Sequence, residues 1–324
     1  SFLSRSFERH FNERPYLHHT CYLFLTKTTK ERSRQQSNWN TLCRGFLVPK
    51  EIRDKETVER FMEAVGQFES IVNDSGLVKL ERLTTEEITG TESEPGIIER
   101  YLTLSADGSR MLQDMQLNPD EMRIGDKRLC LHTLSDLDDL PGKVRTDGRY
   151  ERLSTDRSDC RLSHAAPVGV MLPCDHIYNQ WIFIDDSNEN LSRFEKAAKN
   201  MQSLSRYSRS NQINKEWLDE YLNEAHSNGL QSIRCHCNVI AWAENGEELR
   251  RVKNDVGSAL ALMECTPHHN TTDLPAVYWA GIPGNEADFP SEETFYTFTG
   301  QALCFFTAET CYRNSLSPFG IRMV

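Results

Sequence analysis

A chain of 324 residues is longer than the roughly 250–300 residues at which a single hydrophobic core stops growing, so we expect two lobes. Its 38% hydrophobic and 26% charged residues are typical of a soluble globular protein with a real core. No run approaches the ~18 apolar residues of a membrane span, and the first residues lack the apolar stretch of a signal peptide. The net charge of −11 argues against general binding to nucleic acid.

The charge is unevenly distributed along the chain. Residues 1–50, which we term the basic head, hold nine Lys and Arg against three acidic residues, a net charge of +6, while the remaining residues carry −17. This contrast predicts one local contact between the basic head and an acidic partner or an anionic membrane. Two alternatives stay open, namely a helix packed on its own domain and a DNA-binding module. The candidate contact residues are Phe2, Arg5, Phe7, Arg9, Phe11, Arg14, Lys27, Lys30, Arg32 and Arg34.

The pattern in residues 1–140 predicts a first lobe. Apolar residues on both faces indicate a buried strand at 18–27. Residues 54–74 indicate an amphipathic helix with one apolar stripe. A strand at 75–83, short helices within 84–104 and a strand at 126–135 follow. The polar, turn-rich residues 141–170 are typical of a connection between lobes. The helix stripe consists of Val58, Phe61, Val65, Phe68 and Val72.

A second lobe is expected over residues 171–324. Strands are predicted at 176–185 and 230–245, and helices at 188–204, 214–229 and 246–264. The first of these helices should bury a face that runs to Leu204, and the second a face that begins at Trp217 and ends before Gly229. Residues 295–306 are apolar, and their pattern does not decide between helix and strand. The alternation predicts an α+β fold in which each lobe packs helices on a mixed or antiparallel sheet.

The stretch "WIFIDD" reads like the acidic, magnesium-holding strand of a P-loop ATPase. A P-loop also needs G-x-x-x-x-G-K-[ST], whose glycine amides cradle phosphate, and no segment of the sequence fits that pattern. We therefore expect neither ATP nor magnesium to bind these residues. Asp186 is predicted instead to cap the following helix, with Glu189 completing a capping box.

The ten Cys residues include no C-x-x-C pair, so reduced thiols in a cytosolic compartment are expected. A zinc site is the alternative at "RCHCN", but a strand would place Cys235 and Cys237 on one face and His236 on the other. Cys265 and His268 are the residues that could complete such a site. A free-standing enzyme with a Cys160–His164 nucleophile pair is a further alternative.

The stretch "YWAGIPGNEADFP" contains two Gly, two Pro and one Asn, which predicts a fixed turn after an apolar strand. This turn, at Pro283, Gly284 and Asn285, is either a rigid element at the edge of a nucleotide or partner site or only a tight connection.

Several segments resemble the TraG proteins of Bacteroides-type conjugative transposons, which resemble the wider VirB/CagE/TrbE class of type IV secretion ATPases. The matching segments, which spread over essentially the whole chain, include "SFLSRSFERHFNERPYLHHTCYLFLTKTTKERSR", "CRGFLVPKEIRDKETV", "MRIGDKRLCLHTLSD", "SRYSRSNQINKEWLDEYLNEAHSNGL" and "VKNDVGSALALMEC". The "AGIPGN" turn looks like the proline-glycine-asparagine turn that precedes the ATPase core in that class.

The resemblance implies a non-catalytic N-terminal docking and assembly domain of a DNA-transfer motor. Its implied partners are inner-membrane subunits of a conjugation channel and its own C-terminal ATPase core, in a full-length hexamer at the cytoplasmic side of the inner membrane. ATP and magnesium are then expected only in that core, and no specific nucleic acid is expected. Because the chain starts without Met and stops in an apolar segment, we expect a piece of a longer protein.

Overall fold

The computed structural model describes residues 19–27, 55–76, 78–105, 113–118, 121–144, 148–149, 161–169, 172–204, 207–269 and 273–307. The chain forms two compact units. The first comprises residues 1–19, 114–275 and 290–324, and the second comprises residues 20–113 and 276–289. The units divide the chain at other places than the expected lobes 1–140 and 171–324.

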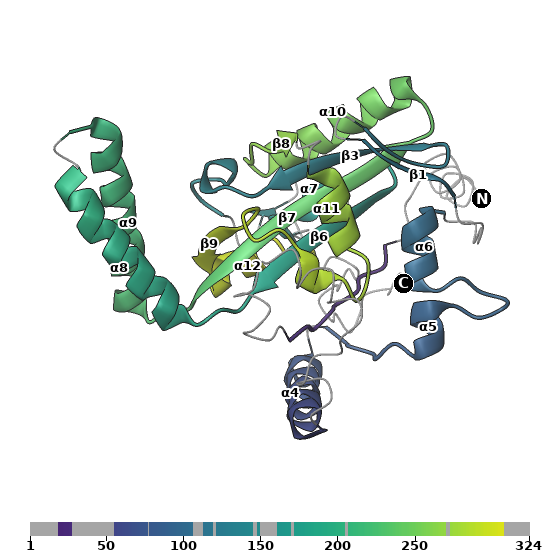
Figure 1. Ribbon diagram of the computed structural model, residues 1–324, viewed down its shortest axis with the longest axis horizontal. Helices are drawn as coiled ribbons and strands as arrows, with labels where there is room; N and C mark the ends of the chain where they lie inside the picture. The colour runs from purple at the N-terminus through teal and green to yellow at the C-terminus, as the bar shows by residue number, and fades with distance from the viewer. Residues whose placement is uncertain are drawn as a thin grey trace, which may run out of the picture. The chain divides into compact units, whose positions relative to one another are not determined.

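The long strand β7 (Ser232–Ala243) organises the sheet of the first unit (Figure 1). One edge of β7 pairs with β6 (His176–Phe183). The other edge pairs first with β9 (Phe295–Phe298) and then, further along, with β3 (Lys127–Leu134). All of these pairs are antiparallel, so their side chains alternate between two faces of one sheet.

Short elements complete the first unit. The sheet is extended beyond β3 by β2 (Met122–Ile124), β1 (Met115–Leu117) and β8 (His268–His269). A separate pair joins β4 (Gly148–Arg149) to β5 (Arg161–Leu162). The remaining elements are the 3₁₀ turn η1 (Leu137–Asp139) and the short helices α7 (Ala166–Gly169) and α12 (Thr299–Leu303).

Helix α10 (Gly246–Leu262) covers one face of this sheet and forms the main core with it. Asn245 starts the helix, because its side-chain oxygen accepts hydrogen bonds from the amides of Glu247 and Glu248. Each large aliphatic side chain buried here contributes about 1.5–3 kcal/mol to folding. The apolar spacing of residues 246–264 indicates one inward face, and all residues of that face are buried: Leu249, Val252, Val256, Leu260 and Met263.

Two long helices, α8 (Ser187–Leu204) and α9 (Arg209–Asn228), form a hairpin between β6 and β7. Figure 1 shows this hairpin leaving the end of the sheet, with the end of α8 and the start of α9 far from the sheet. Leu191 and Ala198 pack against Leu222 and Ala225, together with Phe298 of β9. Gly229 ends α9 in the left-handed conformation, with φ of 61°, as the sequence predicted.

The second unit contains α4 (Lys55–Asp74), α5 (Thr85–Thr89), α6 (Ile97–Thr103), most of α11 (Leu274–Ala280) and the 3₁₀ turn η2 (Glu286–Asp288). A capping box between Thr84 and Glu87 starts α5. Two buried tyrosines join α6 to α11: the Tyr101 hydroxyl donates to the Tyr278 carbonyl oxygen at 2.9 Å, and the Tyr278 hydroxyl donates to the Tyr101 carbonyl oxygen at 2.6 Å. These reciprocal bonds fix the two helices to each other.

The predicted α+β class with an antiparallel sheet is confirmed. Three local predictions are wrong. Residues 19–27 are exposed and form no strand, residues 78–83 form no strand, and the residues before the "AGIPGN" turn form helix α11. The described part of the second unit holds helices only, so these segments have no strand partner there. None of the described helices is both long and apolar enough to cross a bilayer.

Candidate functional site

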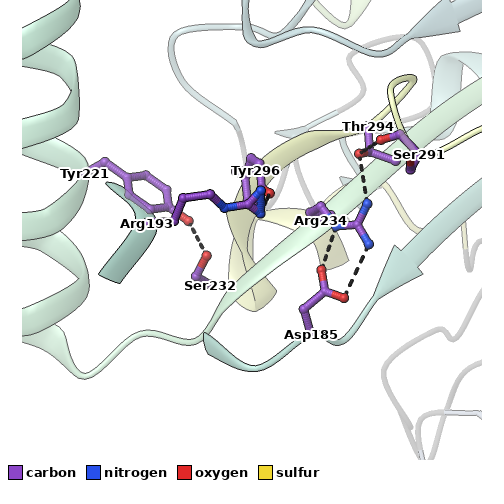
Figure 2. A network of polar contacts seen from close by, with 8 residues as sticks. All are labelled: Asp185, Arg193, Tyr221, Ser232, Arg234, Ser291, Thr294 and Tyr296. Atoms are coloured by element: carbon purple, nitrogen blue, oxygen red, sulfur yellow. Dashed lines mark hydrogen bonds and ion pairs between the residues drawn. The ribbon is translucent and has the colours of Figure 1, made fainter. Parts of the chain in front are cut away.

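A partly buried ion pair lies where β6 ends and β7 begins. The Arg234 Nε donates to Asp185 Oδ2 at 2.6 Å, and Nη2 donates to Oδ1 at 3.3 Å. The guanidinium also donates to the Thr294 hydroxyl (Figure 2). It lies 5.1 Å from the centre of the Phe183 ring. The hydrogen bond to Asp185 raises the pKa of Arg234. Both oxygens of the Asp185 carboxylate therefore accept hydrogen bonds from Arg234, which is a structural role rather than that of a ligand-binding group.

The neighbouring Asp186 has the role that the sequence predicted. Its carboxylate accepts hydrogen bonds from the amide of Asn188 at 3.0 Å and from the amide of Glu189 at 3.4 Å, at the start of α8. The predicted N-cap is confirmed, but the predicted capping box is not formed, because Glu189 contributes its backbone amide and not its side chain. Both carboxylates of "WIFIDD" therefore have structural roles in this chain.

A group of polar and aromatic contacts fastens the α8–α9 hairpin to the sheet (Figure 2). The Arg193 guanidinium of α8 donates to the Tyr296 hydroxyl of β9 at 2.7 Å. The Tyr221 hydroxyl of α9 donates to the Ser232 hydroxyl of β7 at 2.8 Å, and the Tyr221 ring stacks on Phe298 at 4.5 Å. Because both helices are held, the hairpin has a defined orientation relative to the sheet.

The face of β7 that carries Arg234, opposite the face covered by helix α10, also holds a chain of two amides and a buried imidazole. The Asn179 amide donates to Asn238 Oδ1 at 3.0 Å, the Asn238 amide lies 2.9 Å from His236 Nε2, and His236 Nδ1 lies 2.6 Å from the Glu293 carbonyl oxygen. Burial lowers the pKa of His236 to about 4. The imidazole is therefore neutral at pH 7, with Nδ1 as donor and Nε2 as acceptor.

The predicted separation of thiols and imidazole in "RCHCN" is confirmed. Cys235 and Cys237 lie in the hydrophobic core, whereas His236 points to the opposite face. Burial raises the pKa of Cys235 and of Cys265 to about 12, and it also raises the pKa of Cys237, so all three thiols stay protonated. His268 Nε2 lies 2.7 Å from Asp139 Oδ1. Among the described residues, no three His, Cys, Asp or Glu side chains are close enough to share a metal ion.

Of the predicted Cys160–His164 pair, only His164 lies within the described residues. His164 packs edge-to-face against Phe305, with ring centres 5.3 Å apart. Cys160 lies outside the described residues, so a Cys160–His164 pair stays a sequence-based alternative.

The "AGIPGN" turn is held by its own hydrogen bonds. Gly284 has φ of 102°, and its amide donates to the Glu286 carboxylate at 3.0 Å. The Asn285 side chain donates to the Trp279 carbonyl oxygen at 3.3 Å, which ties the turn back to α11. The backbone amide of Asn285 donates to the Ile282 carbonyl oxygen at 2.9 Å, so Pro283 and Gly284 lie inside a hydrogen-bonded turn, as in a rigid connection.

Most of the predicted contact residues of the basic head lie outside the described residues, so their role stays a prediction. Lys27 is described and is exposed. The others are Phe2, Arg5, Phe7, Arg9, Phe11, Arg14, Lys30, Arg32 and Arg34.

Two exposed apolar surfaces are the features that sequence reasoning missed. On α4 the predicted stripe is confirmed as one helix face, but none of its residues is buried. At the far end of the α8–α9 hairpin, Leu204 and Trp217 are exposed, so the expectation that both side chains pack inward is wrong. The helical period indicates which face is apolar but not what covers that face, so the sequence held no signal for this exposure.

Comparison of the chain with protein-family models and with curated proteins found no match. Function is therefore argued from the surfaces of the molecule and from the resemblance of its segments.

Proposed function

We propose that this chain is a docking and assembly domain, without a reaction of its own, of a conjugative DNA-transfer ATPase of the TraG type. The domain works at the cytoplasmic side of the inner membrane and attaches the motor to membrane subunits of the conjugation channel. The resemblance of the segments quoted above supports this assignment. The commitment of Asp185, Asp186 and the buried thiols to structural roles agrees with it.

The observation that carries the proposal is the apolar stripe of α4. This helix of 20 residues has a regular apolar face, yet none of its residues is buried. Val58 and Phe68 of the stripe are each 40% exposed, and Met62, which lies outside the stripe on the same helix, is 47% exposed. The other stripe residues, Phe61, Val65 and Val72, are half-buried. Amphipathic helices owe most of their stability to the packing of such a face, so a stripe that is only partly covered on an ordered helix is typical of a surface that a partner covers.

The net charge of α4 indicates which kind of partner covers the apolar stripe. Residues 55–74 hold five acidic residues against Lys55 and Arg60, a net charge of −3. Cytoplasmic segments next to membrane spans are enriched in Lys and Arg, so an inner-membrane subunit presents the complementary charge. The proposed occupant is therefore an apolar segment with basic flanks, located at the cytoplasmic end of a channel subunit.

Binding of purified inner-membrane subunits to the chain tests this function. The stripe variants are Val58→Ser and Phe68→Ser, and the control variants are Leu117→Ser and Leu137→Ser, which remove exposed leucines of the first unit. Each stripe variant should weaken binding of one subunit roughly tenfold, because it removes an apolar anchor from the interface. The controls should bind like the unmodified chain.

Thermal unfolding is measured on all four variants to verify that they fold, which we expect because the replaced side chains are exposed. The proposed function fails if no inner-membrane subunit binds the chain. It also fails if the stripe variants and the controls bind equally well.

A further inference from the structure

The far end of the α8–α9 hairpin exposes a cluster of large apolar side chains. We define the hairpin tip as residues 199–217, which include the end of α8, the connection and the start of α9. Leu204 is 44%, Tyr207 is 84%, Ile213 is 37% and Trp217 is 56% exposed. Ile213 and Trp217 are four residues apart and therefore share one face of α9. Apolar exposure is thus concentrated at the tip, while the base of the hairpin is covered.

Charge is segregated along the same hairpin. The tip holds four basic residues against one acidic residue, a net charge of +3, although the whole chain carries −11. The rest of the hairpin, residues 187–198 and 218–228, holds two basic residues against five acidic ones, a net charge of −3. The basic residues within 199–217 are Lys199, Arg206, Arg209 and Lys215, of which Arg206 lies outside the described residues. An anionic surface therefore attracts the tip and repels the base.

We propose that the hairpin tip binds an anionic lipid surface. Trp and Tyr prefer the boundary between lipid and water because their rings are apolar and their N–H or O–H groups remain hydrated. Lys and Arg beside them are attracted to anionic headgroups, and the acidic base of the hairpin stays away from the membrane. This assignment rests on the proposed function for the identity of the membrane, which is the cytoplasmic face of the inner membrane.

The contacts that hold the α8–α9 hairpin to the sheet favour lipid binding by its tip. Arg193 and Tyr221 tie α8 and α9 to β9 and β7, so the tip is presented in a fixed direction. A pre-ordered hairpin loses little conformational freedom on binding. The same surface could instead bind a protein, and the experiment separates these two occupants.

Trp217 supplies a direct optical readout of membrane contact. The full chain is titrated with vesicles of phosphatidylethanolamine and phosphatidylglycerol, and with phosphatidylcholine vesicles as the neutral comparison. Trp emission should shift to shorter wavelength with the anionic vesicles, because the indole leaves water. Trp217→Phe should abolish the shift. Trp279→Phe should retain it, because Trp279 is exposed to a similar extent, at 52%, but belongs to the second unit.

Vesicle sedimentation measures the contribution of charge. Lys199→Gln and Arg209→Gln should each weaken binding to the anionic vesicles about fivefold, which corresponds to about 1 kcal/mol for a basic residue near such a surface. Arg250→Gln, which neutralises an exposed residue of α10, is the matched control and should leave binding unchanged. The basic head is intact in every variant, so differences among them belong to the tip.

The proposal is overturned if no Trp217-dependent shift occurs with anionic vesicles. It is also overturned if the tip variants bind vesicles normally but lose binding to a purified inner-membrane subunit, because the tip is then a protein contact. These failures leave the proposed function intact. Conversely, if the tip binds lipid but no channel subunit binds the chain, the proposed function is wrong and the lipid contact is still supported.

Discussion

His236 shows how a buried polar residue is accommodated in the sheet of the first unit. Its two ring nitrogens face opposite partners, the Glu293 carbonyl oxygen and the Asn238 side-chain amide. Only the neutral imidazole satisfies both contacts, since a protonated Nε2 would face the Asn238 N–H groups. Burial favours the neutral form and outweighs the hydrogen bond to the Glu293 carbonyl, which raises the pKa, so the stability of the fold depends on pH.

We predict that protonation of His236 destabilises the protein in mild acid. Burial lowers its pKa from 6.5 to about 4, so the unfolded chain binds more protons than the folded chain between these values. This contribution to stability is complete above pH 6.5 and is lost as the pH falls through about 4. At about 1.4 kcal/mol per pH unit, the full loss is about 3 kcal/mol.

Urea unfolding midpoints at a series of pH values in that window give the measurement. His236→Gln should remove most of this pH dependence, whatever it does to stability at neutral pH. His226→Gln is the control, because His226 is exposed on α9 and forms a surface ion pair with Glu195. Burial also lowers the pKa of His176, but that residue is retained in all three proteins. Equal slopes for wild type and His236→Gln would show that His236 does not carry the effect.

For single residues, the sequence correctly predicted the features that depend on the local geometry of one strand or helix. The alternation of a strand placed His236 opposite Cys235 and Cys237. The partner of Asn238 was not predictable, because Asn179 lies 59 residues away and meets it only through the register of β6 on β7. The Arg234–Asp185 pair was missed for the same reason.

Elements with strong local signals were predicted well. The helices at α4, α8, α9 and α10 follow from regular apolar spacing and from caps such as Asp186 and Gly229. Apolar runs without period were predicted poorly. Residues 19–27 are exposed rather than paired, and residues 295–306 change from β9 to α12 at Thr299, where the sequence holds no breaker except Gly300. Local propensity does not decide such segments, because tertiary pairing does.

The turn after α11 allows a test of backbone strain. Gly284 has φ of 102°, a conformation that side chains with a Cβ rarely adopt, and nothing lies within 4 Å of an added Cβ. Gly284→Ala should therefore cost about 1–3 kcal/mol through the backbone alone. Gly257→Ala, also in open space but inside α10, should be neutral or stabilising by up to about 1 kcal/mol.

Urea denaturation of both variants gives the two free energies of unfolding. A Gly284→Ala protein as stable as the unmodified chain would mean that the turn relaxes without cost. The interpretation of "AGIPGN" as a fixed turn would then be wrong, whereas its resemblance to the proline-glycine-asparagine turn would be untouched.

For the whole molecule, the pattern of charge links the two proposals. The stripe-bearing helix α4 carries −3 and is assigned to a basic protein segment, while the hairpin tip carries +3 and is assigned to anionic lipid. The basic head, with a net charge of +6, is the third charged feature. A chain with a net charge of −11 would be repelled by an anionic membrane unless basic surfaces such as these faced it.

We predict that the basic head adds a membrane contact that is independent of the tip. Phe2, Phe7 and Phe11 alternate with Arg5, Arg9 and Arg14 in the first residues. Deleting residues 1–14 should weaken sedimentation with anionic vesicles by one to two orders of magnitude, because three basic residues at about 1 kcal/mol each are removed, and the loss of Glu8 and Glu13 offsets part of that effect. The effect should shrink as salt rises, since exposed charges are screened over about 8 Å at physiological ionic strength.

The deletion is compared with the triple variant Arg5→Gln, Arg9→Gln, Arg14→Gln, which keeps the apolar residues and the length of the chain. Both proteins should retain the Trp217-dependent shift of emission, because the tip is unchanged. Thermal unfolding separates the contact from the alternative in which this segment packs on its own domain. If the deletion unfolds the chain while the triple variant binds vesicles normally, the segment belongs to the core, and the tip alone accounts for binding to the membrane.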